Sequence, residues 1–191
     1  MRRQTKKKRM LPCITMFIML IIVLFITGCE QQQGWTPQYN NKYTVFVNSV
    51  IDGDTIKVIL PNDSIATIRF LGIDCPEKTA ETNQANEYEN ITNRSCLAVY
   101  GNKAKTYIDQ LINQKQVSIE FDETSGFKDI YDRWLAYVYL ANGTDVNILL
   151  LQNGYARTYT EGNCNHEAQY LAIQQTAIEH NKGLWTCAID E

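Results

Sequence analysis

Three short β-rich runs follow one another closely in the sequence, and turn residues separate them. The runs cover residues 43–50, 55–60 and 65–71. The Asp52-Gly53 pair favours a tight hairpin between the first two runs, and residues 61–64 supply a second turn. Two more β-rich runs cover residues 117–121 and 134–140. The sequence therefore predicts a three-stranded meander and five strands in total.

Helical periodicity appears between the third and fourth runs. Apolar residues recur there at spacings of three and four, which predicts an amphipathic helix over residues 97–113. A short second helix is predicted around Val146–Leu150, closed by Gly154, and a third from Ala168 to Ile178, ending near Gly183. A helix between the third and fourth of five strands is the layout of an OB-type barrel. We therefore expect an α+β fold, a five-stranded OB-type β-barrel with three packed helices.

The N-terminus has the features of an export signal. Six basic residues precede an apolar run from Met10 to Ile26, and the segment Ile26-Thr27-Gly28-Cys29 follows. This pattern predicts a lipoprotein signal peptide over residues 1–28, with lipid attached to Cys29 after cleavage. An uncleaved anchor helix is the alternative. Either reading places the protein on the extracellular side of a bacterial cell membrane, with release of a soluble form as a further option.

The remaining chain divides into a linker and one domain. Residues 29–42 are polar and without periodicity, which predicts a flexible tether, and residues 43–187 suffice for one domain with a core. The leader holds six of the 18 Lys and Arg residues and none of the 21 Asp and Glu residues, so the rest carries a net charge of −9. A general polyanion binder is excluded, because nonspecific affinity for nucleic acid comes mainly from Lys and Arg. Any nucleic-acid contact must be local.

Five charged residues suggest a phosphodiesterase site. Asp54 and Asp74 offer hard oxygen ligands for a divalent cation, and Glu77 is a candidate general base. Arg69 and Arg133 would stabilise charge that develops on a phosphate. Each has a plainer reading: an Asp-Gly hairpin turn, a solvent-facing arginine on an edge strand, a charged loop end. Strict alternation would put Arg69 and Asp74 on opposite faces, so we expect the strand to bend or end near Gly72.

Taken together, these motifs resemble the staphylococcal nuclease family. The resemblance covers Ile51-Asp52-Gly53-Asp54-Thr55, the segment 68–77 and Tyr131-Asp132-Arg133. It implies calcium-dependent hydrolysis of DNA and RNA, with cleavage of the bond between phosphorus and the 5′-oxygen and products that end in 3′-phosphates. The family pattern implies catalytic Arg69, Glu77 and Arg133, calcium bound by Asp54, Asp74 and the backbone carbonyl of Cys75, and a phosphate contact from Tyr131.

The chain departs from the family pattern at two of these positions. Cys75 replaces the usual threonine, which keeps the carbonyl but removes a hydroxyl, and Ile130 replaces a lysine, which removes a cation from the substrate pocket. Tyr159 is a candidate stacking platform for bases. We expect a monomer.

Cysteines and histidines leave several options open. Cys75, Cys96, Cys164 and Cys187 fall in the exported domain, and four cysteines allow three pairings. We expect Cys75–Cys96, with Cys164–Cys187 as the complementary pair, although that second bridge requires the chain to fold back along the third helix. A zinc site with Cys164 and His166 is the alternative, but the spacing does not match a finger. We expect His166 to open the third helix and His180 to lie at its C-terminal end.

Two other classes of protein remain compatible with the pattern. One is a non-catalytic, surface-anchored OB module that binds nucleic acid, and the other is a membrane-tethered structural protein. A binding module has no need for two metal-ligating acids, a glutamate and two arginines, so the five charged residues favour an enzyme. A structural protein predicts no dependence on calcium.

Overall fold

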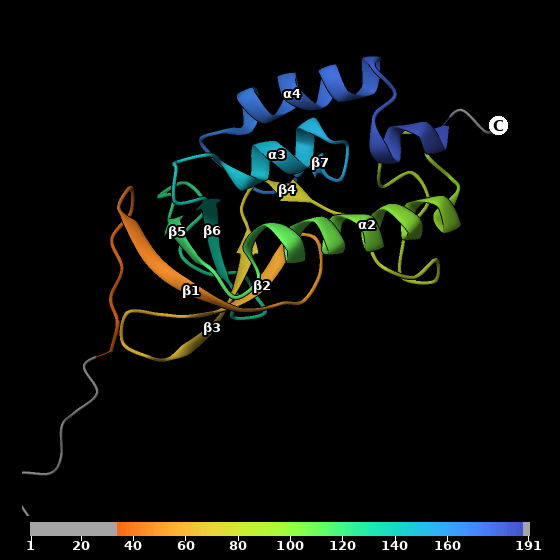
Figure 1. Cartoon of the computed structure of the whole chain (residues 1–191). Helices are drawn as coiled ribbons and strands as arrows, with labels where there is room; N and C mark the ends of the chain where they lie inside the picture. The colour runs from red at the N-terminus through yellow and green to blue at the C-terminus, as the bar shows by residue number, and fades with distance from the viewer. Residues whose placement is uncertain (1–33, 189–191) are drawn as a thin grey trace, which may run out of the picture. The chain divides into compact units, whose positions relative to one another are not determined.

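The computed structural model describes residues 34–188. Its elements are β1 (Lys42–Val50), β2 (Thr55–Ile59), β3 (Ile65–Phe70), β4 (Ile73–Asp74), α2 (Arg94–Ile112), β5 (Gln116–Glu120), β6 (Trp134–Tyr139), α3 (Val146–Gln152), β7 (Arg157–Thr158), α4 (Glu167–Glu179) and the 3₁₀-helix η1 (Gly183–Ala188). The five expected strands and three expected helices are present (Figure 1). None of the helices within the described residues is long and apolar enough to cross a bilayer. The expected signal peptide lies outside them.

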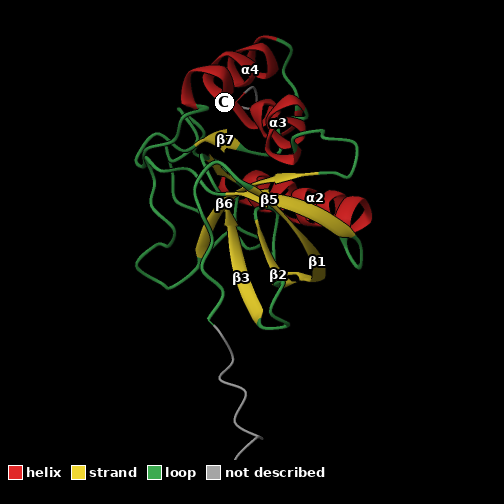
Figure 2. Cartoon of the chain, turned by 90° about the vertical axis from the view of Figure 1, so that its left-hand side faces the viewer, coloured by secondary structure: helices red, strands yellow, loops and turns green. Residues whose placement is uncertain are grey.

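The five long strands form a closed barrel in the order β1-β2-β3-β6-β5. Neighbouring strands are antiparallel except β3 and β6, which run parallel. Closure removes the open edges that a five-stranded sheet would otherwise expose. In both views α3 and α4 gather at one end of the barrel, beside β7 (Figures 1 and 2). The strand β7 pairs with β4 in a separate two-stranded sheet. The expected OB-type α+β fold is confirmed.

A bend after β3 creates the small sheet. Gly72 has a φ of +77°, a conformation that side chains other than glycine's rarely adopt. The chain therefore leaves the barrel at the expected glycine and forms β4, which pairs antiparallel with β7. The sequence indicated a loop from Asp74 to Glu77, so β4 was not anticipated. The strand β7 and the 3₁₀-helix η1 were not anticipated either. Two-residue strands carry too little periodicity to be recognised.

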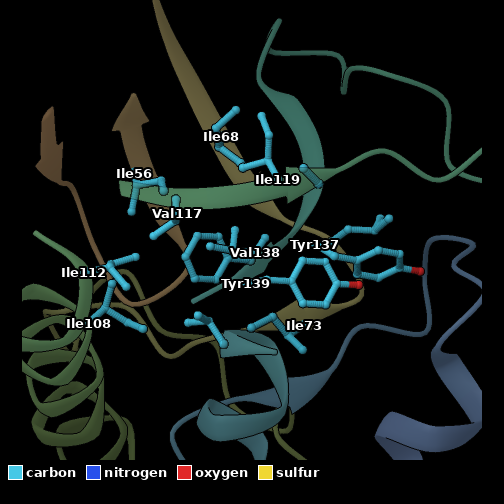
Figure 3. Close-up of a cluster of buried hydrophobic side chains, with 14 of the residues drawn as sticks. Ile56, Ile68, Ile73, Ile108, Ile112, Val117, Ile119, Tyr137, Val138 and Tyr139 are labelled. Atoms are coloured by element: carbon cyan, nitrogen blue, oxygen red, sulfur yellow. The ribbon is translucent and has the colours of Figure 1, made fainter. Parts of the chain in front are cut away.

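The core fills the barrel and continues to its helices. Branched aliphatic residues from the strands meet Ile108 and Ile112 of α2, and the phenyl rings of Tyr137 and Tyr139 complete the layer (Figure 3). A second cluster of buried residues joins α2 to α4 and η1 around Leu97, Ala177 and Trp185. Burial of each large aliphatic side chain contributes roughly 1.5–3 kcal/mol, so these two clusters fix where α2 and η1 lie.

Part of the expected tether packs on the barrel. The ring of Trp35 contacts Trp134 at a centroid distance of 5.4 Å, and Tyr39 stacks on Phe127 at 4.0 Å. The backbone N–H of Asn40 donates to the carbonyl of Phe121 at 2.8 Å. Aromatic burial therefore holds residues 35–42 against the domain.

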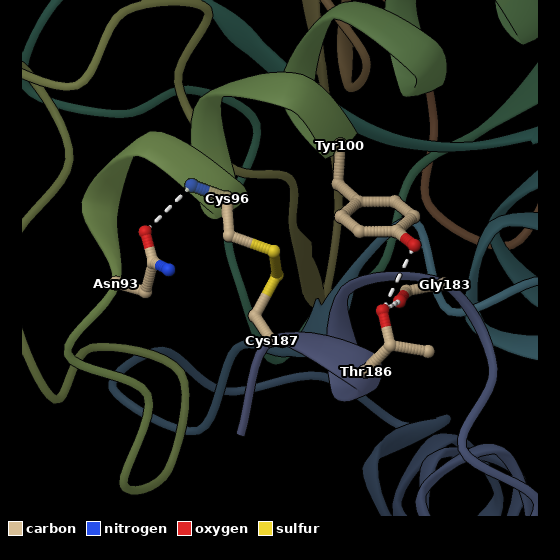
Figure 4. The surroundings of a disulfide bond; sticks show 6 residues. All are labelled: Asn93, Cys96, Tyr100, Gly183, Thr186 and Cys187. Atoms are coloured by element: carbon tan, nitrogen blue, oxygen red, sulfur yellow. Dashed lines mark hydrogen bonds between the residues drawn. A yellow bond between two sulfur atoms is a disulfide. The ribbon is translucent and has the colours of Figure 1, made fainter. Parts of the chain in front are cut away.

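The disulfide joins Cys96 to Cys187, so both expected pairings, Cys75–Cys96 and Cys164–Cys187, are wrong (Figure 4). The chain does fold back after α4, but it brings η1 onto the start of α2. There the hydroxyls of Tyr100 and Thr186 lie 2.9 Å apart. Cys75 and Cys164 remain free thiols, the first buried in the main core and the second beside Gly72.

The expected positions of both histidines are confirmed. His166 precedes α4 as its N-cap residue and His180 follows it as the C-cap. Among residues 34–188, no three His, Cys, Asp or Glu side chains are grouped as a metal site. Cys164 and His166 do not belong to a zinc cluster there. His166 instead stacks on Tyr137 at 4.0 Å.

Candidate active site

Strand register brings three separate segments to one end of the barrel. Thr55 of β2 faces Arg69 of β3, and the N–H of Phe70 donates to the carbonyl of Asp54 at 2.8 Å. Trp134 of β6 faces Ile68 of β3. Arg133, the residue before Trp134, therefore lies just before β6 and beside β3, the strand that carries Arg69.

These segments line a cleft of about 920 Å³. Every residue proposed from the sequence for catalysis, calcium binding or substrate binding lies on its wall: Asp54, Arg69, Asp74, Cys75, Glu77, Tyr131, Arg133 and Tyr159. Cys29 lies outside the described residues. The volume is within the range of about 300–1,000 Å³ that is typical of ligand sites.

Arg69 lies between two carboxylates at the base of the cleft. Its Nη1 is ion-paired with Asp54 Oδ1, and its Nη2 bonds Asp74 Oδ1 at 2.6 Å. The second oxygen of Asp54 accepts from the backbone N–H of Cys75 at 2.6 Å. The guanidinium is therefore held in place by the residue before β2 and by β4 together, and Arg69 is not the solvent-facing arginine of the plainer reading.

Asp74 accepts further hydrogen bonds from residues that sequence reasoning did not identify. Tyr88 donates its hydroxyl to Asp74 Oδ2 at 3.0 Å, and Arg157 Nε bonds the same oxygen at 3.2 Å. Arg157 also pairs with Glu161. The β4–β7 register, which sets Asp74 opposite Arg157, explains this contact. Nothing local in the sequence marked Arg157, because its partner lies 83 residues away.

The electrostatics of the cleft are dominated by a surplus of carboxylates. Burial raises the pKa of Asp54, and the nearby Asp52 raises it further, although Arg69 opposes both effects. Desolvation also raises the pKa of Glu77, followed by repulsion from Asp54 and Asp74. Burial alone would lower the pKa of Arg69, but its two carboxylate partners raise it above the ordinary value. The cleft thus favours an added cation, and Glu77 is a stronger base than a free glutamate.

The backbone of Glu77 is held from two sides. The side chain of Asn83, which is 2% exposed, accepts from the N–H of Glu77 at 2.9 Å and donates to its carbonyl at 2.8 Å. On the other side α2 approaches through Gly101, where a Cβ atom would lie 2.3 Å from the carbonyl oxygen of Pro76 and 2.5 Å from that of Glu77. Only glycine allows this contact. Periodicity alone would have identified Gly101 merely as a weak helix position.

The loop that carries Arg133 is organised by Asp129. One oxygen of Asp129 accepts from the backbone N–H groups of Tyr131 and Arg133, and the other pairs with Arg133 Nε at 2.7 Å. The guanidinium of Arg133 lies 5.5 Å from the centre of the Tyr131 ring. Burial opposes ionisation of Asp129, but these donors lower its pKa below the usual range. Arg133 therefore enters the cleft from a fixed loop.

Two aromatic residues offer stacking surfaces on the cleft wall. The side chain of Tyr131 is 73% exposed, and that of Tyr159 is 37% exposed. Tyr159 lies 5.5 Å from the guanidinium of Arg157, and its N–H donates to the carbonyl of Gly72 at 3.0 Å. Ile130, which stands where the resemblance implied a lysine, is 91% exposed. That side of the cleft therefore presents apolar surface.

The residues present fit a hard divalent cation better than zinc. Asp54 and Asp74 converge on one guanidinium, so their carboxylates lie close together in a cleft with surplus negative charge. Burial, followed by the nearby Asp54, raises the pKa of the Cys75 thiol, which keeps it protonated and unsuited to bind metal as a thiolate. Carboxylate and carbonyl oxygens are the donors that calcium prefers. The carboxylates of Asp54 and Asp74 and the carbonyl of Cys75 would supply three of them.

Comparison with known proteins identifies the family of this chain. Residues 67–187 match the family model described as staphylococcal nuclease homologue. An uncharacterised protein of Methanocaldococcus jannaschii is 33% identical over 88% of this chain and 93% of its own. Endonuclease YncB of Bacillus subtilis is 34% identical over 82% of this chain and 69% of its own. The thermonuclease of Staphylococcus hyicus is 29% identical over 88% of this chain and 91% of its own.

Proposed function

Because the chain belongs to the staphylococcal nuclease family, we propose that its cleft hydrolyses phosphodiester bonds of DNA and RNA in a calcium-dependent reaction. The products would carry 3′-phosphate ends. One observation carries the proposal: Arg69, fixed between two acids, shares a cleft with a base of raised pKa and with a second arginine. A barrel that only binds strands has no use for this arrangement.

Each side chain has a role that follows from its chemistry. Glu77 accepts a proton from the attacking water, and its raised pKa makes that transfer more favourable. Arg69 and Arg133 contact the equatorial oxygens of the phosphate, whose negative charge grows in the transition state. Calcium, when bound by Asp54, Asp74 and the Cys75 carbonyl, would supply Lewis-acid stabilisation of the same charge. Asp129 keeps Arg133 oriented before substrate arrives.

One assay tests the proposal directly. Plasmid DNA and a structured RNA are incubated with the full-length protein in calcium, in magnesium and in chelator. We expect cleavage of both polymers in calcium only, with product ends that a DNA polymerase extends only after phosphatase treatment. Binding without cleavage in calcium would support the non-catalytic OB module instead. Full cleavage in chelator would exclude the calcium mechanism.

We also propose that the enzyme is held at the outer face of a bacterial membrane through lipid on Cys29. The basic and apolar leader and the Gly28-Cys29 junction support this. Several acyl chains, at about 0.8 kcal/mol per buried CH₂, would make the attachment persistent. Cys29→Ala should move the protein from the membrane fraction to the medium or leave its leader uncleaved. Unchanged processing and fractionation would contradict the lipid anchor.

A further inference from the structure

A second hollow adjoins the cleft on the far side of Arg133. Its volume is about 470 Å³, and its wall includes Trp35, the turn at Asn62 and Ser64, and the start of β3. Lys128, Tyr131 and Arg133 line both this hollow and the cleft. These three residues thus form a ridge that the two hollows share. A strand bound in the cleft can cross the ridge without leaving the protein surface.

The surface chemistry of the hollow matches a nucleoside. Tyr131 is 73% exposed and Ile65 is 65% exposed, so two flat or apolar surfaces face solvent beside polar groups. The polar groups include the side chains of Asn62, Ser64 and Thr67. A nucleobase has apolar faces that stack on aromatic rings and polar edges that form hydrogen bonds. Exposed apolar surface flanked by amide and hydroxyl groups can contact both the faces and the edges of a base.

The charges argue against an isolated phosphate as the occupant. Lys128 Nζ pairs with Asp132 at 2.6 Å, and Arg133 pairs with Asp129 at 2.7 Å. The Nζ of Lys128 and the Nε of Arg133 are therefore each engaged by an acid of their own loop. Phosphate affinity comes from uncompensated positive charge, and the remaining N–H groups of Arg133 are assigned to the scissile phosphate in the cleft, so the hollow has little such charge left. Stacking on a base and hydrogen bonding to its edge do not require uncompensated positive charge.

We propose that this hollow is a nucleoside subsite that binds the same single strand whose scissile phosphate lies in the cleft. The proposal rests on the nuclease function proposed above. It gives a role to the exposure of Tyr131 and Ile65, since most large apolar side chains among residues 34–188 pack into the two cores. The subsite reads no sequence, because every base has a face that can stack.

Binding of oligonucleotides of increasing length tests the subsite. Fluorescein-labelled oligodeoxythymidylates, from the dinucleotide upward, are titrated with the full-length Glu77→Gln protein in calcium, and anisotropy reports affinity. Once the strand is long enough to reach the hollow, affinity should rise about five- to a hundredfold, the range of one base stacked on an aromatic ring. Ser64→Glu, added to the same background, puts charge into the hollow and should remove that step while leaving dinucleotide affinity unchanged.

Gln110→Glu is the matched control. It adds the same charge at an exposed position of α2 outside both hollows, and should leave the step intact. Persistence of the step in Ser64→Glu, or its absence in the parent protein, would overturn the subsite. Cleavage is measured separately with the Glu77-containing protein. If the parent protein shows no affinity step but the wild type cleaves, the subsite is refuted and the nuclease function stands. If the parent protein shows a clear step but the wild type does not cleave, only the nuclease function is contradicted.

Discussion

Asn83 brackets the peptide backbone of Glu77, accepting from its N–H at 2.9 Å and donating to its carbonyl at 2.8 Å. The same amide group also donates to the carbonyl of Thr79 at 2.7 Å. The candidate base therefore stands on a segment whose main chain is fixed by a buried side chain. Gly101 of α2 closes the other side. The fold therefore determines where the Glu77 segment lies in the cleft.

Asn83→Ala should lower kcat on single-stranded DNA by up to about 10²-fold, because a small displacement of a positioned group has that effect. KM should change much less. The buried backbone groups left without partners should also destabilise the protein by about 1–3 kcal/mol. Asn142→Ala is the control, since Asn142 makes a similar turn contact to Thr144 in a loop outside the cleft. Equal kcat values for wild type and Asn83→Ala would refute the positioning role.

Glu77→Gln should reduce kcat by about 10²–10⁴-fold with a small change in KM, the loss expected for a positioned base. Arg133→Lys keeps the charge but loses the planar fork that grips two phosphate oxygens, so it should also affect turnover more than affinity. Steady-state kinetics on a defined oligonucleotide give both constants. Wild-type rates combined with weakened binding would make these residues simple phosphate contacts.

Asp54→Asn should weaken calcium binding and abolish most of the calcium-stimulated cleavage. Asp54 is buried and ion-paired with Arg69, so the substitution also removes part of the compensation for a buried charge. We therefore expect a lower Tm as well as lower calcium affinity, measured by calorimetry of unfolding and by calcium titration. Asp63→Asn, on an exposed turn, is the control for loss of one carboxylate. A calcium affinity equal to that of the wild type would remove Asp54 from the ligand set.

Peptide mapping of the unreduced protein should recover Cys96 linked to Cys187, with Cys75 and Cys164 alkylated only as free thiols. The bridge spans 91 residues of sequence. Its loss in a Cys96→Ser, Cys187→Ser protein should destabilise the domain by about 2–4 kcal/mol, chiefly through the unfolded state. Cys164→Ser should have a smaller effect. A Cys75–Cys96 peptide in the map would contradict the structure.

Acid should weaken the protein partly through Asp122. Its buried carboxylate accepts hydrogen bonds from Tyr137, Asn165 and Thr124, which lower its pKa below the ordinary 3.8 despite burial. Because the pKa of Asp122 is lower in the folded state than in the unfolded state, its ionised carboxylate stabilises the fold at pH values above the unfolded-state pKa. This stabilisation is lost as the pH falls through the folded-state pKa. Asp122→Asn should therefore lower the free energy of unfolding by about 1.5–3 kcal/mol near neutral pH. The difference from wild type should shrink below about pH 4, as followed by urea unfolding.

Some residues of the site could be predicted from the sequence and others could not. Asp54, Arg69 and Asp74 stand in or beside motifs that the sequence displays within a few residues, so their type and order were enough to propose them. Asn83, Tyr88 and Arg157 gave no such signal. Their partners lie six, 14 and 83 residues away, and a buried hydrogen bond at such separations leaves no periodic trace. The barrel's register decides which of these distant residues meet.

The disulfide shows the same limit from another direction. The sequence could count four cysteines in the domain, but pairing depends on where η1 packs, and that is set by burial of Leu97, Ala177 and Trp185. Local spacing favoured Cys75 with Cys96, whereas the fold buries Cys75 in a different cluster.

The sequence by itself determined the strand and helix order, the barrel class, the family resemblance and the charged residues suited to phosphodiester chemistry. These follow from short-range patterns: period-two and period-3.6 apolar spacing, turn residues and compact motifs. Only the tertiary structure decided which groups hold those residues, how the cysteines pair and where a second hollow meets the cleft. Such contacts arise when barrel closure brings together segments far apart in the chain, and the free energy that selects them is burial of a shared core.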